Sequence, residues 1–285
     1  MKKKWIVLGL VITIVTMLTG CDLKVLDPKG PVAENQANVI KISMWTMAFI
    51  VITVVSLYIF MLTKYRASKA TKDYKPPHIE GSKVLETIWI IIPILIVAFL
   101  SVVTIKSTSE VEATPKGYED QEPLIIYAAS SNWKWHFSYP EQNIETVNYV
   151  NIPVNRPIEF RLYSYGPITS LWIPQLAGQK YAMSDMVNTL HLLADTPGSY
   201  FGRNANFSGA GFAEMEFETL AMPQKDFDSW VTDVKQTADN LTEKDFNGLL
   251  KDGHVGRKTY NGTHLTFLPA PEGEHAGHHH MKMNE

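Results

Sequence analysis

Hydrophobic and polar positions divide this chain into two unlike parts. The first part contains two long uncharged runs, residues 42–63 with 22 residues and residues 87–105 with 19. An α-helix rises about 1.5 Å per residue and the hydrocarbon core of a bilayer is about 30 Å thick, so each run is long enough to cross a membrane. We therefore predict transmembrane helices at about 40–63 and 85–105, rather than the buried helical hairpin of a soluble protein.

From about residue 107 onward, apolar positions alternate with polar ones. On one expected strand the alternate positions are all aromatic: Trp133, Trp135, Phe137 and Tyr139. The polar residues between them are Lys134, His136 and Ser138. The same period of two recurs over 158–164 and 214–219, and Pro and Gly residues separate these segments. A period of two is typical of strands, and many short strands favour a sandwich or barrel. We predict an all-β domain over 107–223, with the aromatic face in its core or against a partner.

The pattern changes again after residue 223. Apolar residues over 224–252 recur at helical spacing among charged ones, so we predict a helical extension over 224–268. The final stretch, 269–285, is polar and contains His275, His278, His279 and His280. We expect this tail to be disordered rather than to bind metal.

The charges of the two parts differ in sign. Residues 107–285 carry 23 acidic and 13 basic side chains, whereas residues 1–106 have a net charge of +7. The soluble part therefore lacks the basic patch that a nucleic-acid-binding protein needs. The expected loop at 64–83 holds six Lys or Arg residues and two acidic ones, and short loops of this kind stay in the cytoplasm. Both ends of the mature chain, and the β domain, are then expected outside the cytoplasm.

The N-terminus has the pattern of an export signal. Three lysines precede an apolar run over 5–18, and the run ends in Leu18-Thr19-Gly20-Cys21. This ending resembles a bacterial lipobox, in which the cysteine receives a diacylglyceryl thioether and becomes the mature N-terminus. We predict a lipoprotein signal peptide over 1–20 and lipidation of Cys21; the alternative is an uncleaved signal anchor. Cys21 is the one cysteine of the chain, which excludes an intramolecular disulfide and a Cys-rich metal site.

Three motifs, taken in this order with the two spans, carry a family resemblance. They are Glu86-Thr87-Ile88-Trp89 leading into Pro93, the aromatic stretch Trp133-Lys134-Trp135-His136-Phe137, and Ser170-Leu171-Trp172-Ile173-Pro174. Over residues 35–255 the chain resembles subunit II of the heme–copper terminal oxidases. The resemblance implies a membrane-anchored all-β fold, in which a hairpin of two transmembrane helices precedes a cupredoxin-like β-sandwich or barrel with a C-terminal helical extension.

Members of this family that oxidise cytochrome c hold a dinuclear copper centre in the cupredoxin-like domain. In this chain the matching ligand positions are Thr169, Asn204, Ser208, Phe212 and Met215, so only the methionine is retained. Two bridging thiolates give such a centre its soft sulfur ligands, and this sequence has none at these positions. We expect no copper here and an ordinary core methionine at Met215. The loss resembles the quinol oxidases, in which quinol delivers electrons from the bilayer.

Glu86 is the residue to which the resemblance gives a functional role. In relatives the matching glutamate lies at the mouth of a proton-uptake channel, which implies a proton entrance at Glu86. The alternative is an interfacial acid, which costs little because it reaches water at the start of the span.

The resemblance implies subunit II of a terminal oxidase that oxidises membrane quinol, reduces oxygen to water and translocates protons across a bacterial plasma membrane. We expect no cofactor in this chain and expect the hemes and copper in subunit I, because neither span contains a histidine. Other small membrane subunits, bilayer lipid and quinol are the remaining expected partners. The alternative from another class is a lipoprotein scaffold or assembly factor with a degenerate cupredoxin domain, outside any working oxidase.

Overall fold

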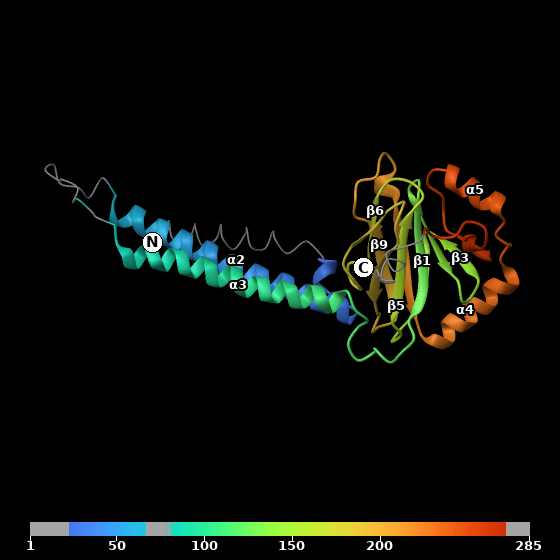
Figure 1. The fold of residues 1–285 in the computed structure, drawn as a ribbon, viewed down its shortest axis with the longest axis horizontal. Coiled ribbons are helices and arrows are strands. Elements are labelled where there is room, and N and C mark those ends of the chain that lie inside the picture. Colours follow the sequence, from blue (N-terminus) through green and yellow to red (C-terminus); the bar gives the residue numbers. More distant parts are fainter. Residues whose placement is uncertain (1–22, 67–77, 79–80, 272–285) are drawn as a thin grey trace, which may run out of the picture.

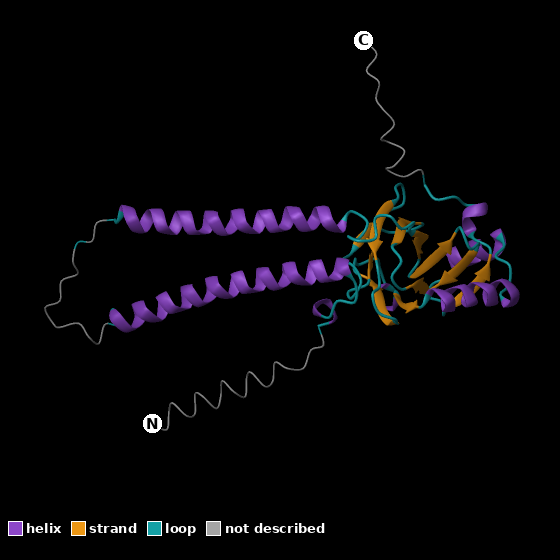
Figure 2. Ribbon diagram, turned by 90° about the horizontal axis from the view of Figure 1, so that it is seen from below, coloured by secondary structure: helices purple, strands orange, loops and turns teal. Residues whose placement is uncertain are grey.

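The computed structural model describes residues 23–66, 78 and 81–271, and its first feature is a long helical hairpin. Helix α2 spans Pro31–Lys64 and helix α3 spans Lys83–Val111. They lie side by side and project away from a compact β domain (Figures 1 and 2). Their apolar windows have mean hydropathies of 2.3 and 2.9, and none of that surface is buried by the protein. Both predicted spans are confirmed as helices that are long and apolar enough to cross a membrane.

Helix α2 begins nine residues before the span that we predicted at about 40–63. Its first turns leave the apolar run and pack on the β domain, where Val32, Ala33 and Ala37 are buried. Pro31 stands at the first helical position, where its fixed φ favours helix and its missing N–H is not needed. A hydrophobicity criterion marks only the part of a helix that lipid surrounds, so it missed these turns.

The β domain, residues 124–271, contains two sheets. Its strands are β1 Leu124–Ser131, β2 Lys134–Tyr139, β3 Ile144–Val147, β4 Tyr149–Pro153, β5 Ile158–Ser164, β6 Thr169–Trp172, β7 Lys180–Ala182, β8 Asn188–Leu192, β9 Gly198–Asn204, β10 Glu216–Met222 and β11 Lys258–Asn261. One sheet has the order β11-β3-β2-β1-β5-β8 and the other β4-β10-β9-β6-β7. Two pairs, β1 with β5 and β4 with β10, are parallel, and the remaining pairs are antiparallel.

The main core lies between the two sheets, as the alternating pattern predicts. Trp135, Phe137 and Tyr139 of β2 are fully buried in it, and the ring of Phe217 from β10 lies 5.1 Å from that of Phe137. Met215 is also buried in this core. The β-sandwich expected from the sequence is confirmed.

The predicted extension contains helix α4, Gln224–Thr237, and helix α5, Glu243–Lys251, on the side of the β domain away from α2 and α3 (Figure 1). It is not helical throughout, because β11 pairs antiparallel with β3 and widens the first sheet. A 3₁₀ turn, η4 at His264–Thr266, follows β11. Together α5 and the residues after β11 form a second core, which contains Val147 and Phe246.

The residues before α2 are also attached to the β domain. A 3₁₀ turn, η1, spans Lys24–Leu26. The Lys29 N–H donates to the carbonyl of Gln175 at 2.8 Å, and the Lys29 carbonyl accepts from the Asp195 N–H at 2.9 Å. Gly30 is needed here, because a Cβ at this position would lie 1.9 Å from the carbonyl oxygen of Leu193.

Several predictions fall outside the described residues. These are the signal peptide at 1–20, Cys21, most of the loop at 64–83, and the His-containing tail from residue 272 onward. They stay predictions.

Candidate functional site

The positions that the resemblance matches to copper ligands lie together at one corner of the β domain. Asn204, at the end of β9, is the centre of this corner. Its Oδ1 accepts from the Ser170 N–H at 2.8 Å, its Nδ2 donates to Ser208 Oγ at 2.9 Å, and its backbone N–H donates to the Met215 carbonyl at 2.9 Å. Thr169 precedes Ser170 on β6, so strands β6 and β9 and the chain leading to β10 all meet here.

The side chains of this corner are neutral and bonded to one another. The Thr169 hydroxyl lies 2.7 Å from Ser130 Oγ, and Thr169 and Asn204 are each 1% exposed. Phe212 belongs to a 3₁₀ turn, η3 at Phe212–Glu214, and its ring lies 5.7 Å from that of Phe207. The positions therefore offer hydroxyl, amide, aromatic and thioether groups, whose polar atoms are already paired with protein.

Trp133 lies beside this corner, not in the aromatic stripe where we predicted it. Its φ is 57°, in the left-handed region, and β2 begins only at the next residue. The indole donates to the Ser208 carbonyl at 3.2 Å, and a Cβ on Gly211 would lie 2.4 Å from the indole ring. The left-handed residue turns the side chain away from the core face, which a strict period of two cannot anticipate.

Glu86 lies far from this corner. It is an exposed residue in the first turn of α3, at the end of the hairpin that is farthest from the β domain (Figure 1). Its N–H donates to the Ser82 carbonyl at 3.0 Å, and its carboxylate reaches back toward Gly81. An acid in the first turn also suits the positive end of the helix dipole. This position therefore fits both a proton entrance and a simple interfacial acid.

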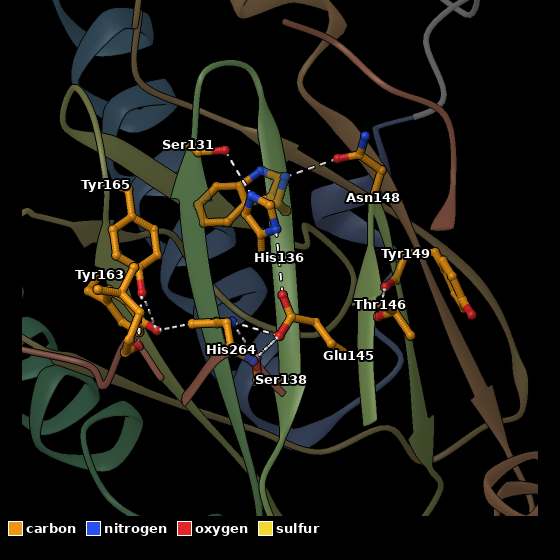
Figure 3. A network of polar contacts seen from close by, with 12 residues as sticks. Ser131, His136, Ser138, Glu145, Thr146, Asn148, Tyr149, Tyr163, Tyr165 and His264 are labelled. Carbon is orange, nitrogen blue, oxygen red and sulfur yellow. Dashed lines mark hydrogen bonds and ion pairs between the residues drawn. The ribbon is translucent and has the colours of Figure 1, made fainter. Parts of the chain in front are cut away.

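A buried ionisable network, which the sequence did not indicate, lies under the extension (Figure 3). Glu145 of β3 is fully buried between His136 and His264. One carboxylate oxygen, Oε2, accepts from Ser138 Oγ at 2.8 Å, from the His264 N–H at 2.9 Å and from His264 Nδ1 at 2.6 Å. On the other side of the ring, His264 Nε2 lies 2.5 Å from the hydroxyl of Tyr163. Because the carboxylate can only accept, His264 Nδ1 carries a proton that it donates to Glu145.

Burial and charge act on this network in opposite directions. Burial alone would raise the pKa of the Glu145 carboxyl, but attraction to His264 and the hydrogen bonds from His264 outweigh it and lower that pKa to about 2. His136 Nδ1 faces the other carboxylate oxygen at 3.7 Å. Burial lowers the pKa of His136, despite the facing carboxylate. Glu145 is therefore held as an anion and His136 as a neutral ring.

Lys134 ties the extension to the same face of the sheet. It is fully buried, and its Nζ donates to the carbonyls of Asn132 at 2.9 Å and Asp252 at 2.6 Å. Asp252 caps the C-terminus of α5, where a cation also suits the helix dipole. Burial lowers the pKa of this ammonium group to about 8. The contacts of Lys134 with Asp252 and of Glu145 with His264 hold the extension on the sheet. The groups are closed off from solvent, so they are not accessible to a substrate.

Comparisons with known proteins agree with this architecture. The family model for the transmembrane domain of cytochrome c oxidase subunit II matches residues 6–106. A quinol oxidase subunit 2 from Bacillus anthracis is 45% identical over 273 residues, which cover 95% of this chain and 94% of that protein. Another, from Bacillus subtilis (strain 168), is 48% identical over 268 residues, covering 93% and 83%.

Among solved structures, the periplasmic domain of cytochrome oxidase subunit II from Bradyrhizobium japonicum is 22% identical. It covers 40% of this chain and 94% of its own, with a TM-score of 0.39. The two Bacillus relatives cover 95% and 93% of this chain, at 45% and 48% identity. The chain therefore belongs to the family of quinol oxidase subunits 2, within the subunit II proteins of the heme–copper oxidases, and is a membrane-anchored subunit of an oxidoreductase complex.

Proposed function

We propose that this chain is a subunit II without a copper centre, in an oxidase that takes electrons from membrane quinol and reduces oxygen to water. The observation that carries this proposal is the Asn204 corner, where amide and hydroxyl groups bond to one another at the family's ligand positions. Such groups do not fit a dinuclear copper centre, which needs imidazole and bridging thiolate ligands. Electrons then pass from the bilayer to subunit I without visiting the β domain.

The hemes and copper of the complex belong, in this proposal, to subunit I. Heme iron takes axial ligands such as histidine, and neither span of this chain contains one. The task of this chain is to support assembly and to admit protons at Glu86, which faces the cytoplasm if the basic loop at 64–83 does. The β domain then lies outside the cytoplasm, on the same side as a lipidated Cys21.

We expect that the β domain binds no copper in stoichiometric amount. The purified chain, shortened to end before His275 so that the tail cannot bind metal, should show no bound copper by elemental analysis after incubation with copper and desalting. The fourfold variant Thr169→His, Asn204→Cys, Ser208→Cys, Phe212→His is the matched control. It restores the family's ligand set beside Met215, so it should gain copper and visible absorbance. Copper bound by the unaltered chain at two ions per molecule would refute the proposal.

We expect the mature chain to begin at a diacylglyceryl Cys21. Mass spectrometry of the N-terminal peptide should show the lipid mass on residues 21–24, and Cys21→Ser should leave the signal peptide uncleaved. Because two spans already hold the chain in the bilayer, oxygen uptake should change little in that variant. A free thiol at Cys21, with residues 1–20 still attached, is the result that would exclude lipidation.

A further inference from the structure

A groove opens where α2 leaves the β domain. Its volume is about 500 Å³. Apolar side chains come from three separate elements, namely Val25 of η1, Val39 and Ile40 of α2, and Trp172 of β6. Gln36 and Ser107 add a polar rim. An apolar trough with a few polar groups at its edge suits an amphipathic ligand rather than a charged one.

The groove lies beside the ends of both apolar runs. On α2, the lining residues Val39 and Ile40 are followed by exposed Lys41 and then by the uncharged run at 42–63. On α3, exposed Lys106 next to Ser107 closes the run at 87–105 in the same way. Lysines that end an apolar run mark the membrane surface, and a tryptophan such as Trp172 is common at that level.

The N-terminal segment is fixed beside this groove. Gln175 Nε2 donates to the Asp27 carbonyl at 3.2 Å and to Asp27 Oδ2 at 3.1 Å, in addition to the backbone bonds of Lys29. These contacts hold Val25 in the groove wall. Val25 is four positions after Cys21, so an extended chain places the cysteine at most about 14 Å from Val25.

We propose that this groove receives the diacylglyceryl group carried by Cys21. The glyceryl ester lies at the polar rim of Gln36 and Ser107, and the first methylene groups of the acyl chains pack against Val39, Ile40 and Trp172 before entering the outer leaflet. Because the bilayer offers the acyl chains an equally apolar environment, the short tether to Val25 and van der Waals packing against these side chains favour this placement. The proposal rests on the lipidation of Cys21 proposed above. The lipid then lies against the joint between α2 and the β domain, in addition to anchoring the N-terminus.

Photo-cross-linking in the assembled oxidase, in native membranes, tests this placement. Val39→p-benzoyl-phenylalanine puts a photoreactive ring in the groove, and Met44→p-benzoyl-phenylalanine puts the same ring on an exposed part of α2 outside it. After irradiation and trypsin digestion, we expect the α2 peptide of the Val39 variant to carry the lipidated peptide 21–24. The yield should exceed that from the Met44 variant several-fold, and adding Ile40→Trp to fill the groove should reduce it.

The other outcomes overturn the proposal in distinguishable ways. Cross-links from position 39 to phospholipid alone would show that bulk lipid fills the groove, and cross-links to another subunit would show a protein occupant. In both cases the mass of peptide 21–24 still reports whether Cys21 is lipidated. If that peptide carries no lipid, the lipidation proposal and this placement both fail. If it carries lipid but no cross-link forms, only the placement fails.

Discussion

Replacing Glu145 by leucine is expected to destabilise the β domain by about 3–5 kcal/mol, which is the cost of breaking a buried charged network by removing one partner. The leucine removes the acceptor of three hydrogen bonds and leaves the backbone N–H of His264 unpaired in the interior. The Ser138 hydroxyl and His264 Nδ1, 3.0 Å apart, keep only each other as partners at this position. Denaturant unfolding of the purified chain in detergent, followed by tryptophan fluorescence, measures this loss of unfolding free energy.

Two variants show that the effect belongs to the buried carboxylate. Glu141 lies in the turn between β2 and β3 and is partly exposed, with its carboxylate 3.8 Å from Arg156. Glu141→Leu should therefore change the unfolding free energy by less than about 1 kcal/mol. Glu145→Gln keeps one acceptor oxygen and should lie between leucine and the parent. If Glu145→Leu unfolds at the parent's denaturant concentration, the network does not hold the extension in place.

The same network gives the β domain a defined response to acid. The pKa of Glu145 is about 2 in the folded chain, against an ordinary value of 4.5. A carboxyl whose pKa is lowered by folding stabilises the protein fully above its ordinary pKa, and that stabilisation is lost as the pH falls toward the folded value. Between about pH 4.5 and 2 the parent should therefore lose more unfolding free energy than Glu145→Leu.

Local patterns were sufficient to predict the two spans and some of the strands of the main core. Hydrophobicity over a whole run identified α2 and α3, and alternation identified β5 and the core face of β2. Each of these features depends on residues close together in the chain. The grouping of Thr169 with Asn204 and Met215 came instead from the family resemblance, because these positions are on different strands.

What could not be predicted depends on contacts between distant segments. Lys134, His136 and Ser138 read as the polar face of a strand, which would ordinarily face water. The extension covers that face, and His264 meets Glu145 across 119 residues of sequence. No local pattern marks such a pairing. The pairing of β11 with β3 and the packing of the first turns of α2 on the β domain were missed for the same reason.

Glu86→Gln is expected to lower oxygen uptake with quinol by roughly tenfold at about pH 9, and by less at about pH 6, without changing heme content or assembly. If Glu86 admits protons, its carboxylate takes them from cytoplasmic water and passes them toward subunit I. Glutamine keeps the shape of the side chain and removes the titratable group. Protons must then reach the channel unaided, which is slowest at high pH, where they are scarce. Oxygen consumption by the purified oxidase, measured across this pH range, gives the result.

Two further variants separate proton transfer from a structural effect on α3. Glu86→Asp keeps an acid one methylene shorter, so it should retain more activity than the glutamine variant, most visibly at high pH. Glu112→Gln alters an exposed acid at the other end of the same helix, beside Lys180, and should leave turnover unchanged at every pH. Suppose instead that Glu86→Gln assembles normally and consumes oxygen at the parent's rate throughout the range. Glu86 is then only an acid at the positive end of the α3 dipole, and assembly and support are the whole task of this subunit.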